Sequence, residues 1–139
     1  MKNNRLAVSI HILSMAAIYK REDLTSDYIA SSVNTNAVVI RRLISQLKKA
    51  GLLHTERGVP GILLTKKPNN ISLLDIYYAI QAEKTSSIFS THENPNPNCD
   101  IGAKIKATLE MSFERAQQAV ERELSTQTLQ DVIEDLFSN

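Results

Sequence analysis

The chain has 139 residues, of which 42% are hydrophobic and 22% are charged, and it carries a single cysteine. This length fits one ordinary domain, or a small domain with an attached helical arm, and the composition is that of a globular protein and not of a disordered one. No apolar run approaches the roughly 18–20 residues that cross a bilayer. One cysteine cannot form an intrachain disulfide framework and agrees with a reducing compartment.

The formal net charge of +1 hides an asymmetry between the two halves of the chain. Residues 1–67 hold 11 Lys/Arg and 4 Asp/Glu, whereas residues 68–139 hold 5 Lys/Arg and 11 Asp/Glu. A basic half joined to an acidic half indicates a polyanion-binding module attached to a part that faces water or itself. Chance clustering on a solvated surface is the alternative, and the position of the charges on the motif described below argues against it.

The first predicted element is a helix over residues 6–19, with Leu6, Ile10, Leu13 and Ala17 on one face. Its basic start and apolar run also suggest a secretion signal. However, polar residues interrupt the run, and no small-x-small cleavage site precedes a plausible mature start. We therefore expect a structural helix that supports the next motif, in a cytoplasmic protein with no membrane partner.

Residues 26–51 are predicted to form a helix-turn-helix, with Thr25 or Ser26 as the first cap and Thr35 or Asn36 as the second. A small residue must stand where two such helices cross, the turn must tolerate positive φ, and apolar residues must pin the second helix. Asparagine enters the left-handed region more readily than other non-glycine residues. The residues in these roles are Ala30 at the crossing, Asn34 in the turn, and Ile29, Val33, Ile40 and Leu43 facing inward.

Two short extended runs follow, over residues 52–57 and 62–65, joined by the Gly/Pro turn 58–61. A hairpin directly after a helix-turn-helix is the wing of a winged helix, here residues 52–65. Ser72 is then predicted to cap a short helix that ends at Ala82. These elements complete a predicted winged helix-turn-helix domain over residues 1–82.

Residues 83–100 are rich in Asn and Pro and are predicted to form a loop, and a long helix follows over about residues 101–124. Thr128 with Asp131 resembles a capping box that opens a last short helix. The long helix spans roughly 36 Å, more than a small winged helix can cover, so we expect its apolar stripe to pair with a second copy. An intrachain helical pair closed by the last helix is the alternative. The stripe consists of Ile105, Leu109, Phe113, Ala116, Val120 and Leu124.

In a winged helix the start of the second motif helix, here residues 35–50, enters the major groove. Asparagine can bond adenine, arginine can bond guanine, and valine can contact the thymine methyl group. Base contacts are therefore expected from Thr35, Asn36, Val38, Val39, Arg41 and Arg42. Backbone contacts are expected from Lys2, Arg5, Thr25, Ser26, Tyr28 and Lys48, and from Arg57 and Gly58 in the wing. An ordinary solvated face is the alternative for the basic residues.

Cys99 lies in the loop immediately before the long helix. A helix N-terminus lowers a thiol pKa and the adjacent Asp100 raises it, so the sequence leaves the direction open. The thiol is inert, or a redox or electrophile sensor, or part of a ligand pocket. The three histidines lack ligand spacing, and no nucleophile motif, carboxylate pair or phosphate-binding glycine loop occurs. Neither a metal site nor an enzyme is predicted.

The chain resembles the bacterial Rrf-type winged-helix regulators, the family of IscR, NsrR and CymR. The resemblance is carried by residues 24–33, by VVIRRL at 38–43 and LKKAGL at 47–52, and by residues 57–61, 64–68 and 71–80. It implies a homodimeric DNA-binding transcription factor, usually a repressor, with long helices crossed at the dimer axis. Cluster-binding members carry three cysteines in the loop where this chain has only Cys99, and one thiol cannot hold an iron–sulfur cluster. No cofactor is expected.

These observations predict a mainly α fold with a β-hairpin wing. The domains expected are a winged helix-turn-helix over residues 1–82, a loop bearing Cys99 over residues 83–100, and dimerisation and C-terminal helices over residues 101–139. The expected partners are double-stranded DNA with two half-sites, a second copy of the chain, and an unknown small-molecule or oxidant effector. The alternative is a helical interaction module that uses the winged helix to bind a protein.

Overall fold

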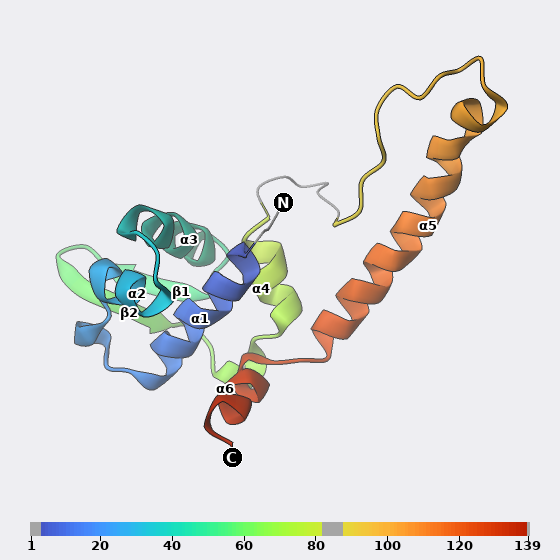
Figure 1. The fold of residues 1–139 in the computed structure, drawn as a ribbon. Coiled ribbons are helices and arrows are strands. Elements are labelled where there is room, and N and C mark those ends of the chain that lie inside the picture. Colours follow the sequence, from blue (N-terminus) through green and yellow to red (C-terminus); the bar gives the residue numbers. More distant parts are fainter. Residues whose placement is uncertain (1–3, 82–87, 139) are drawn as a thin grey trace. The chain divides into compact units, whose positions relative to one another are not determined.

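The computed structural model describes residues 4–81 and 88–138, and helices dominate it (Figure 1). The two strands pair as one antiparallel hairpin. Among the helices of the described residues, none combines the length and the apolar content that a membrane crossing requires. In chain order the elements are α1 (Arg5–Ile18), η1 (Arg21–Asp23), α2 (Ser26–Val33), α3 (Ala37–Lys49), β1 (Leu53–Glu56), β2 (Val59–Leu64), η2 (Pro68–Asn70), α4 (Leu73–Ala79), α5 (Asp100–Ser125) and α6 (Leu129–Phe137).

The chain divides into two compact units. The first comprises Met1–Gln81 and Ser125–Asn139, and the second comprises Ala82–Leu124. This differs from the expected division, which placed the last helix with the long helix in residues 101–139. The physical reason is burial, because Leu129 at the start of α6 is fully enclosed in the core of the first unit.

The first unit is built around α1, which packs against α2, α3, α4, α6 and β2. Ile12 and Leu13 of α1 have no exposed surface. Burying an aliphatic side chain of this size contributes about 1.5–3 kcal/mol. The side chains that pack in this core come from most elements of the first unit and stabilise it together. The fully buried partners are Leu24, Ile29, Ile40, Leu47, Ile71, Ile76 and Leu129.

Two capping boxes bring α4 and α6 together at their N-termini. Ser72 caps α4 and Thr128 opens the box of α6, as the sequence predicted, and Ser72 also forms a capping box with Asp75. An antiparallel bridge links these same two residues, and the Leu129 N–H donates to the Ile71 carbonyl at 2.9 Å. The last helix is therefore attached to the winged-helix unit by backbone hydrogen bonds as well as by its apolar side chain.

The wing is tighter than predicted. Its register pairs Glu56 with Val59, which leaves only Arg57 and Gly58 in the turn in place of the expected residues 58–61. Gly58, the second of the two turn residues, has φ 77°, a left-handed conformation that glycine adopts at little cost. One glycine thus closes the hairpin, and the residues after it join the second strand.

The second unit consists of a loop and α5. This helix has 26 residues, a length of about 39 Å, and none of its residues is buried. Gly102 lies where a Cβ atom would fall 2.2 Å from the Asn96 carbonyl oxygen. The loop thus contacts the start of the helix so closely that only glycine fits there.

Candidate nucleic-acid interface

The corner between α2 and α3 has the geometry that the sequence predicts. Asn34 adopts φ 68° and ψ 51° in the left-handed region. The Ala30 carbonyl accepts hydrogen bonds from the N–H groups of Asn34 at 2.8 Å and Thr35 at 3.0 Å. Ile29 and Ile40, one from each helix, have no exposed surface. The crossing residue, the turn and the inward contacts therefore hold α3 firmly against α2.

Both motif helices begin at side-chain caps. Thr25 accepts a hydrogen bond from the Tyr28 N–H at 3.1 Å, and Asn36 Oδ1 accepts one from the Val39 N–H at 3.0 Å. Ser26 and Thr35, the other predicted candidates, do not act as the caps. The Thr25 hydroxyl proton and the Asn36 amide protons remain available as donors, since a cap uses only the oxygen lone pairs.

The outer face of α3 is polar and basic around one exposed apolar side chain. Val38 is 59% exposed, and Arg41, Arg42 and Lys48 are also exposed. Within the described residues none of these three cations has an ion-pair partner. Ser45, four residues after Arg41, also lies on this exposed face. The helical spacing places it there, but it was not among the predicted DNA-binding residues.

Tyr28 projects from the start of α2. Its ring is 46% exposed and meets the Tyr19 ring edge-on, with 6.4 Å between centroids and 81° between planes. Edge-to-face pairs are a preferred aromatic geometry. The contact fixes the direction in which Tyr28 points, and sequence reasoning missed Tyr19.

Arg5 is directed into the fold and not toward solvent. Its Nη2 donates to Gln46 Oε1 of α3 at 3.0 Å and to the carbonyl of Ile80, the residue after α4. The guanidinium therefore joins three helices of its own unit, and its contact with a DNA phosphate stays a prediction. Lys2, the other N-terminal candidate, lies outside the described residues.

The wing presents one free cation, while its carboxylate has basic neighbours. Arg57 is exposed at the turn without an ion-pair partner among the described residues. Glu56 next to it lies 3.5 Å from Arg21 and 3.6 Å from His54, measured between nitrogen and carboxylate oxygen. A Cβ at Gly61 would fall 1.8 Å from the Arg21 carbonyl oxygen, so η1 and β2 approach at backbone distance.

Cys99 is exposed immediately before α5. Hydrogen bonds from the backbone of Gly102 and Ile101 lower the pKa of the Cys99 thiol below its ordinary value. The direction that the sequence left open is thus set by the first turn of the helix, which stabilises the thiolate.

The six residues of the predicted dimer stripe lie on α5 and are all half-buried. Two large apolar neighbours that the stripe did not include are more exposed, Ile101 at 72% and Met111 at 71%. Ile101 is four residues before Ile105 and so extends the stripe by one helical step. Met111 was not predicted because it does not follow the spacing of three or four residues that defines the stripe.

The model of the Rrf2 family, described as "Iron-dependent Transcriptional regulator", matches residues 2–135. A Bacillus subtilis (strain 168) protein named "Putative HTH-type transcriptional regulator YwnA" is 51% identical over 137 residues, which cover 99% of this chain and 100% of that one. A solved structure described as "a putative DNA binding protein" shares 46% identity with a TM-score of 0.75, over 93% of this chain and 98% of that chain. The structure of T. potens IscR, at 19% identity, shows the same fold with a TM-score of 0.69 over 98% of this chain and 88% of that one.

The helix-turn-helix, the hairpin and these likenesses define a winged helix-turn-helix transcriptional regulator, which is not a class of enzymes. The chain belongs to the Rrf2 family. The fold class and the family expected from the sequence are therefore confirmed.

The iron dependence in the family description does not fit the donor groups of this chain. Cys99 is its one cysteine, and clusters are held by several thiolates. Nowhere in residues 4–81 and 88–138 do three His, Cys, Asp or Glu side chains gather as metal ligands would. No step of the function proposed below passes through iron.

Proposed function

We propose that the chain is a homodimeric repressor that binds an operator of two half-sites with α3 in the major groove. The observation that carries this proposal is the outer face of α3. There Val38 can contact a thymine methyl group while Arg41 and Arg42 reach guanine edges. A repressor acts in this geometry by occupying DNA that the polymerase needs. Such a protein would act in the cytoplasm, where the chromosome lies.

Phosphate contacts would orient this helix on the duplex. The Thr25 hydroxyl and Tyr28 stand at the start of α2, and Lys48 lies at the end of α3. Arg57 and Gly58 at the tip of the wing would lie on the adjacent groove or backbone. Backbone contacts of this kind position a reader without specifying sequence. Ser26 is half-buried and, like Thr35 and Val39, offers less surface to the DNA.

The second copy would be held through α5. A helix of 26 residues without a buried side chain leaves its apolar stripe to be covered, and closed two-fold pairing is the commonest solution. The alternative in which the last helix closes an intrachain pair loses support, because α6 packs on α1 and η2. A dimer would present two copies of α3 to successive major grooves, about one helical turn apart.

Modulation by an effector is part of the proposal. Cys99 is exposed and its thiol pKa is lowered, so an oxidant or electrophile would reach a reactive sulfur near the start of α5. Oxidation by diamide would join two thiols of a dimer as a disulfide, with both protons and both electrons passing to the diamide. DNA affinity that is unchanged by this treatment would remove the sensor role.

The test is DNA affinity with matched variants. The operator is first selected from random-sequence duplexes with the wild-type protein, and binding is then measured by fluorescence anisotropy. We expect Arg41→Ala/Arg42→Ala to lower affinity by at least tenfold, since each bidentate base contact discriminates by about 1–3 kcal/mol. Arg115→Ala removes the same kind of charge from α5 and should bind as the wild type does.

The competing function is a helical module that binds a protein through the winged helix. Equal affinities of the wild type and the Arg41→Ala/Arg42→Ala variant for duplex DNA would favour that function. The exposed cations of α3, which have no ion-pair partner among the described residues, favour DNA, because basic side chains gathered on one helix face are the electrostatic signature of a nucleic-acid-binding surface.

A further inference from the structure

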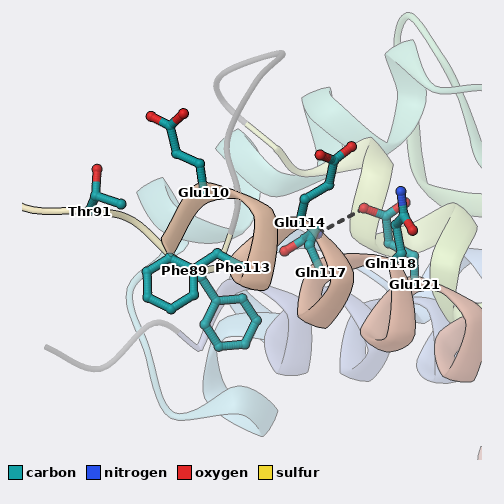
Figure 2. A pocket seen from close by; sticks show the side chains of 8 residues that line it. All are labelled: Phe89, Thr91, Glu110, Phe113, Glu114, Gln117, Gln118 and Glu121. Carbon is teal, nitrogen blue, oxygen red and sulfur yellow. Dashed lines mark hydrogen bonds between the residues drawn. The ribbon is translucent and has the colours of Figure 1, made fainter. Parts of the chain in front are cut away.

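A cavity of about 490 Å³ lies within the second unit, between the segment around Phe89 and the middle of α5 (Figure 2). Its volume is in the range of small-molecule sites, roughly 300–1,000 Å³. No sequence pattern indicated it, because Phe89 and its partner on α5 are 24 positions apart.

One wall of the cavity is aromatic. The rings of Phe89 and Phe113 are stacked, with 5.7 Å between centroids and 29° between planes, and Figure 2 shows them side by side. The Ile88 N–H donates to Gln117 Oε1 at 3.0 Å, which holds the segment on the helix. The two half-buried rings therefore form one apolar surface.

The rest of the wall is acidic. Among the described residues, Glu110, Glu114 and Glu121 line the cavity, and no Lys, Arg or His of that part of the chain does. Gln117 Nε2 donates to Glu121 Oε2 at 2.9 Å, and the dashed line in Figure 2 joins these two side chains. Glu110 and Glu114 are exposed and have no ion-pair partner among the described residues.

Two of the basic side chains of the same helix lie away from this cavity. Arg115 and Arg122 border a different hollow, lined mainly by small residues such as Ala116 and Ala119. These two guanidinium groups thus lie apart from the carboxylates beside the phenyl rings. Three carboxylates face the aromatic cavity from α5, and Lys106, one turn before Glu110, is the neighbouring cation on that side of the helix, so the carboxylates outnumber it.

We propose that this cavity binds a small organic cation with an aromatic or apolar body. The phenyl faces attract a cation through their quadrupoles and cover its apolar part, while Glu110 and Glu114 supply the opposite charge. A metal ion fits poorly, since no three ligand side chains of the described residues converge. The binding is independent of DNA; only its use as a regulatory signal would rest on the proposed function.

The experiment is calorimetric titration of the full chain, without DNA, with three probes that share one phenyl group. The probes are benzyltriethylammonium, benzyl alcohol and benzenesulfonate. We expect the cation to bind at least about tenfold more tightly than the alcohol or the sulfonate, a difference of the size of one partly desolvated cation–π contact with a neighbouring carboxylate. Higher salt should lower the affinity only for the cationic probe.

Matched variants locate the binding. Glu110→Gln/Glu114→Gln should lower affinity for the cation about tenfold, whereas Glu123→Gln, a similar change on α5 outside the cavity, should not. Phe89→Leu removes one ring of the stack, leaves Phe113 of the dimer stripe in place, and should also lower the affinity for the cation. Far-ultraviolet circular dichroism checks that each variant keeps its helices.

Three results would overturn the proposal. The probes bind equally or none binds; or the variant without Glu110 and Glu114 keeps its full affinity; or a second copy of the chain fills the cavity. In that last case the glutamate variant shifts the monomer–dimer equilibrium in sedimentation, and the cation does not bind the dimer. None of these results depends on DNA, so the proposed function would stand or fall separately.

Discussion

Two glycines of the wing both have positive φ but have different neighbours. Substituting each by alanine therefore separates the effect of backbone strain from that of a steric clash. Gly58 has φ 77° with nothing within 4 Å of an added methyl group, whereas at Gly61, with φ 95°, that group would overlap the Arg21 carbonyl. We expect Gly58→Ala to cost about 1–2 kcal/mol from backbone strain alone. Gly61→Ala should cost more than about 4 kcal/mol, because η1 and β2 must separate.

Urea unfolding followed by circular dichroism measures both costs. The comparison is internal, since both substitutions add one methyl group to a glycine with positive φ in the same hairpin. Similar free energies of unfolding for the two variants would show that η1 and β2 do not approach at Gly61 as described.

The Cys99 thiol offers a second test at this scale. Because backbone hydrogen bonds of Gly102 and Ile101 lower its pKa in the folded chain, the thiolate should form at lower pH there than in the unfolded chain. The rate of alkylation by iodoacetamide, in which the thiolate displaces iodide, should therefore reach half its maximum at lower pH in buffer than in denaturant.

The same lowered pKa of Cys99 affects stability. A group whose folded pKa is lowered stabilises the fold above its unfolded pKa, and this contribution disappears as the pH falls through the folded value. An alkylation midpoint that is the same in buffer and in denaturant, or higher in buffer, would contradict the hydrogen bonds at the start of α5.

Among the elements, the helix-turn-helix was the most predictable, because its determinants are local. The Thr25 and Asn36 caps and the left-handed Asn34 each act over three or four residues, so the sequence displays them. The wing was less predictable, since its turn depends on a register set across two strands. The role of Arg5 could not be foreseen at all, because its partners lie 41 and 75 residues away.

The place of α6 shows the same limit. Its capping box and apolar face were evident, but the backbone bridge from Thr128 to Ser72 joins segments 56 positions apart. A periodic pattern states which face of a helix is apolar and not what covers it. The Phe89–Phe113 stack was missed for the same reason.

Two leucines of α6 test its docking. Leu129 is fully buried and Leu136 is 60% exposed. Leu129→Ala should lower the free energy of unfolding by about 2–5 kcal/mol, because it opens a cavity under α1 and η2. Leu136→Ala should change it by less than about 1 kcal/mol. Equal effects of the two substitutions in thermal or urea unfolding would mean that α6 is not part of the first unit.

At the scale of the whole molecule, the structure shows where the basic and acidic side chains of the two halves of the sequence lie. The exposed cations of α3 and the wing belong to the first unit, while Glu110, Glu114 and Glu121 line a cavity in the second. A net charge of +1 therefore conceals a basic face on the first unit and an acidic cavity wall on the second. The two surfaces suit different partners, a polyanion on one unit and an organic cation on the other.

The salt dependence of operator affinity tests the central claim most directly. If the protein neutralises several DNA phosphates, the logarithm of its association constant for the operator should fall linearly with the logarithm of the salt concentration. The slope should be about −0.9 per phosphate contact. Lys48→Ala should make that slope shallower by about 1 for each copy bound, and Arg115→Ala should leave it unchanged. A flat response to salt, or the same slope in Lys48→Ala as in the wild type, would contradict DNA binding through α3.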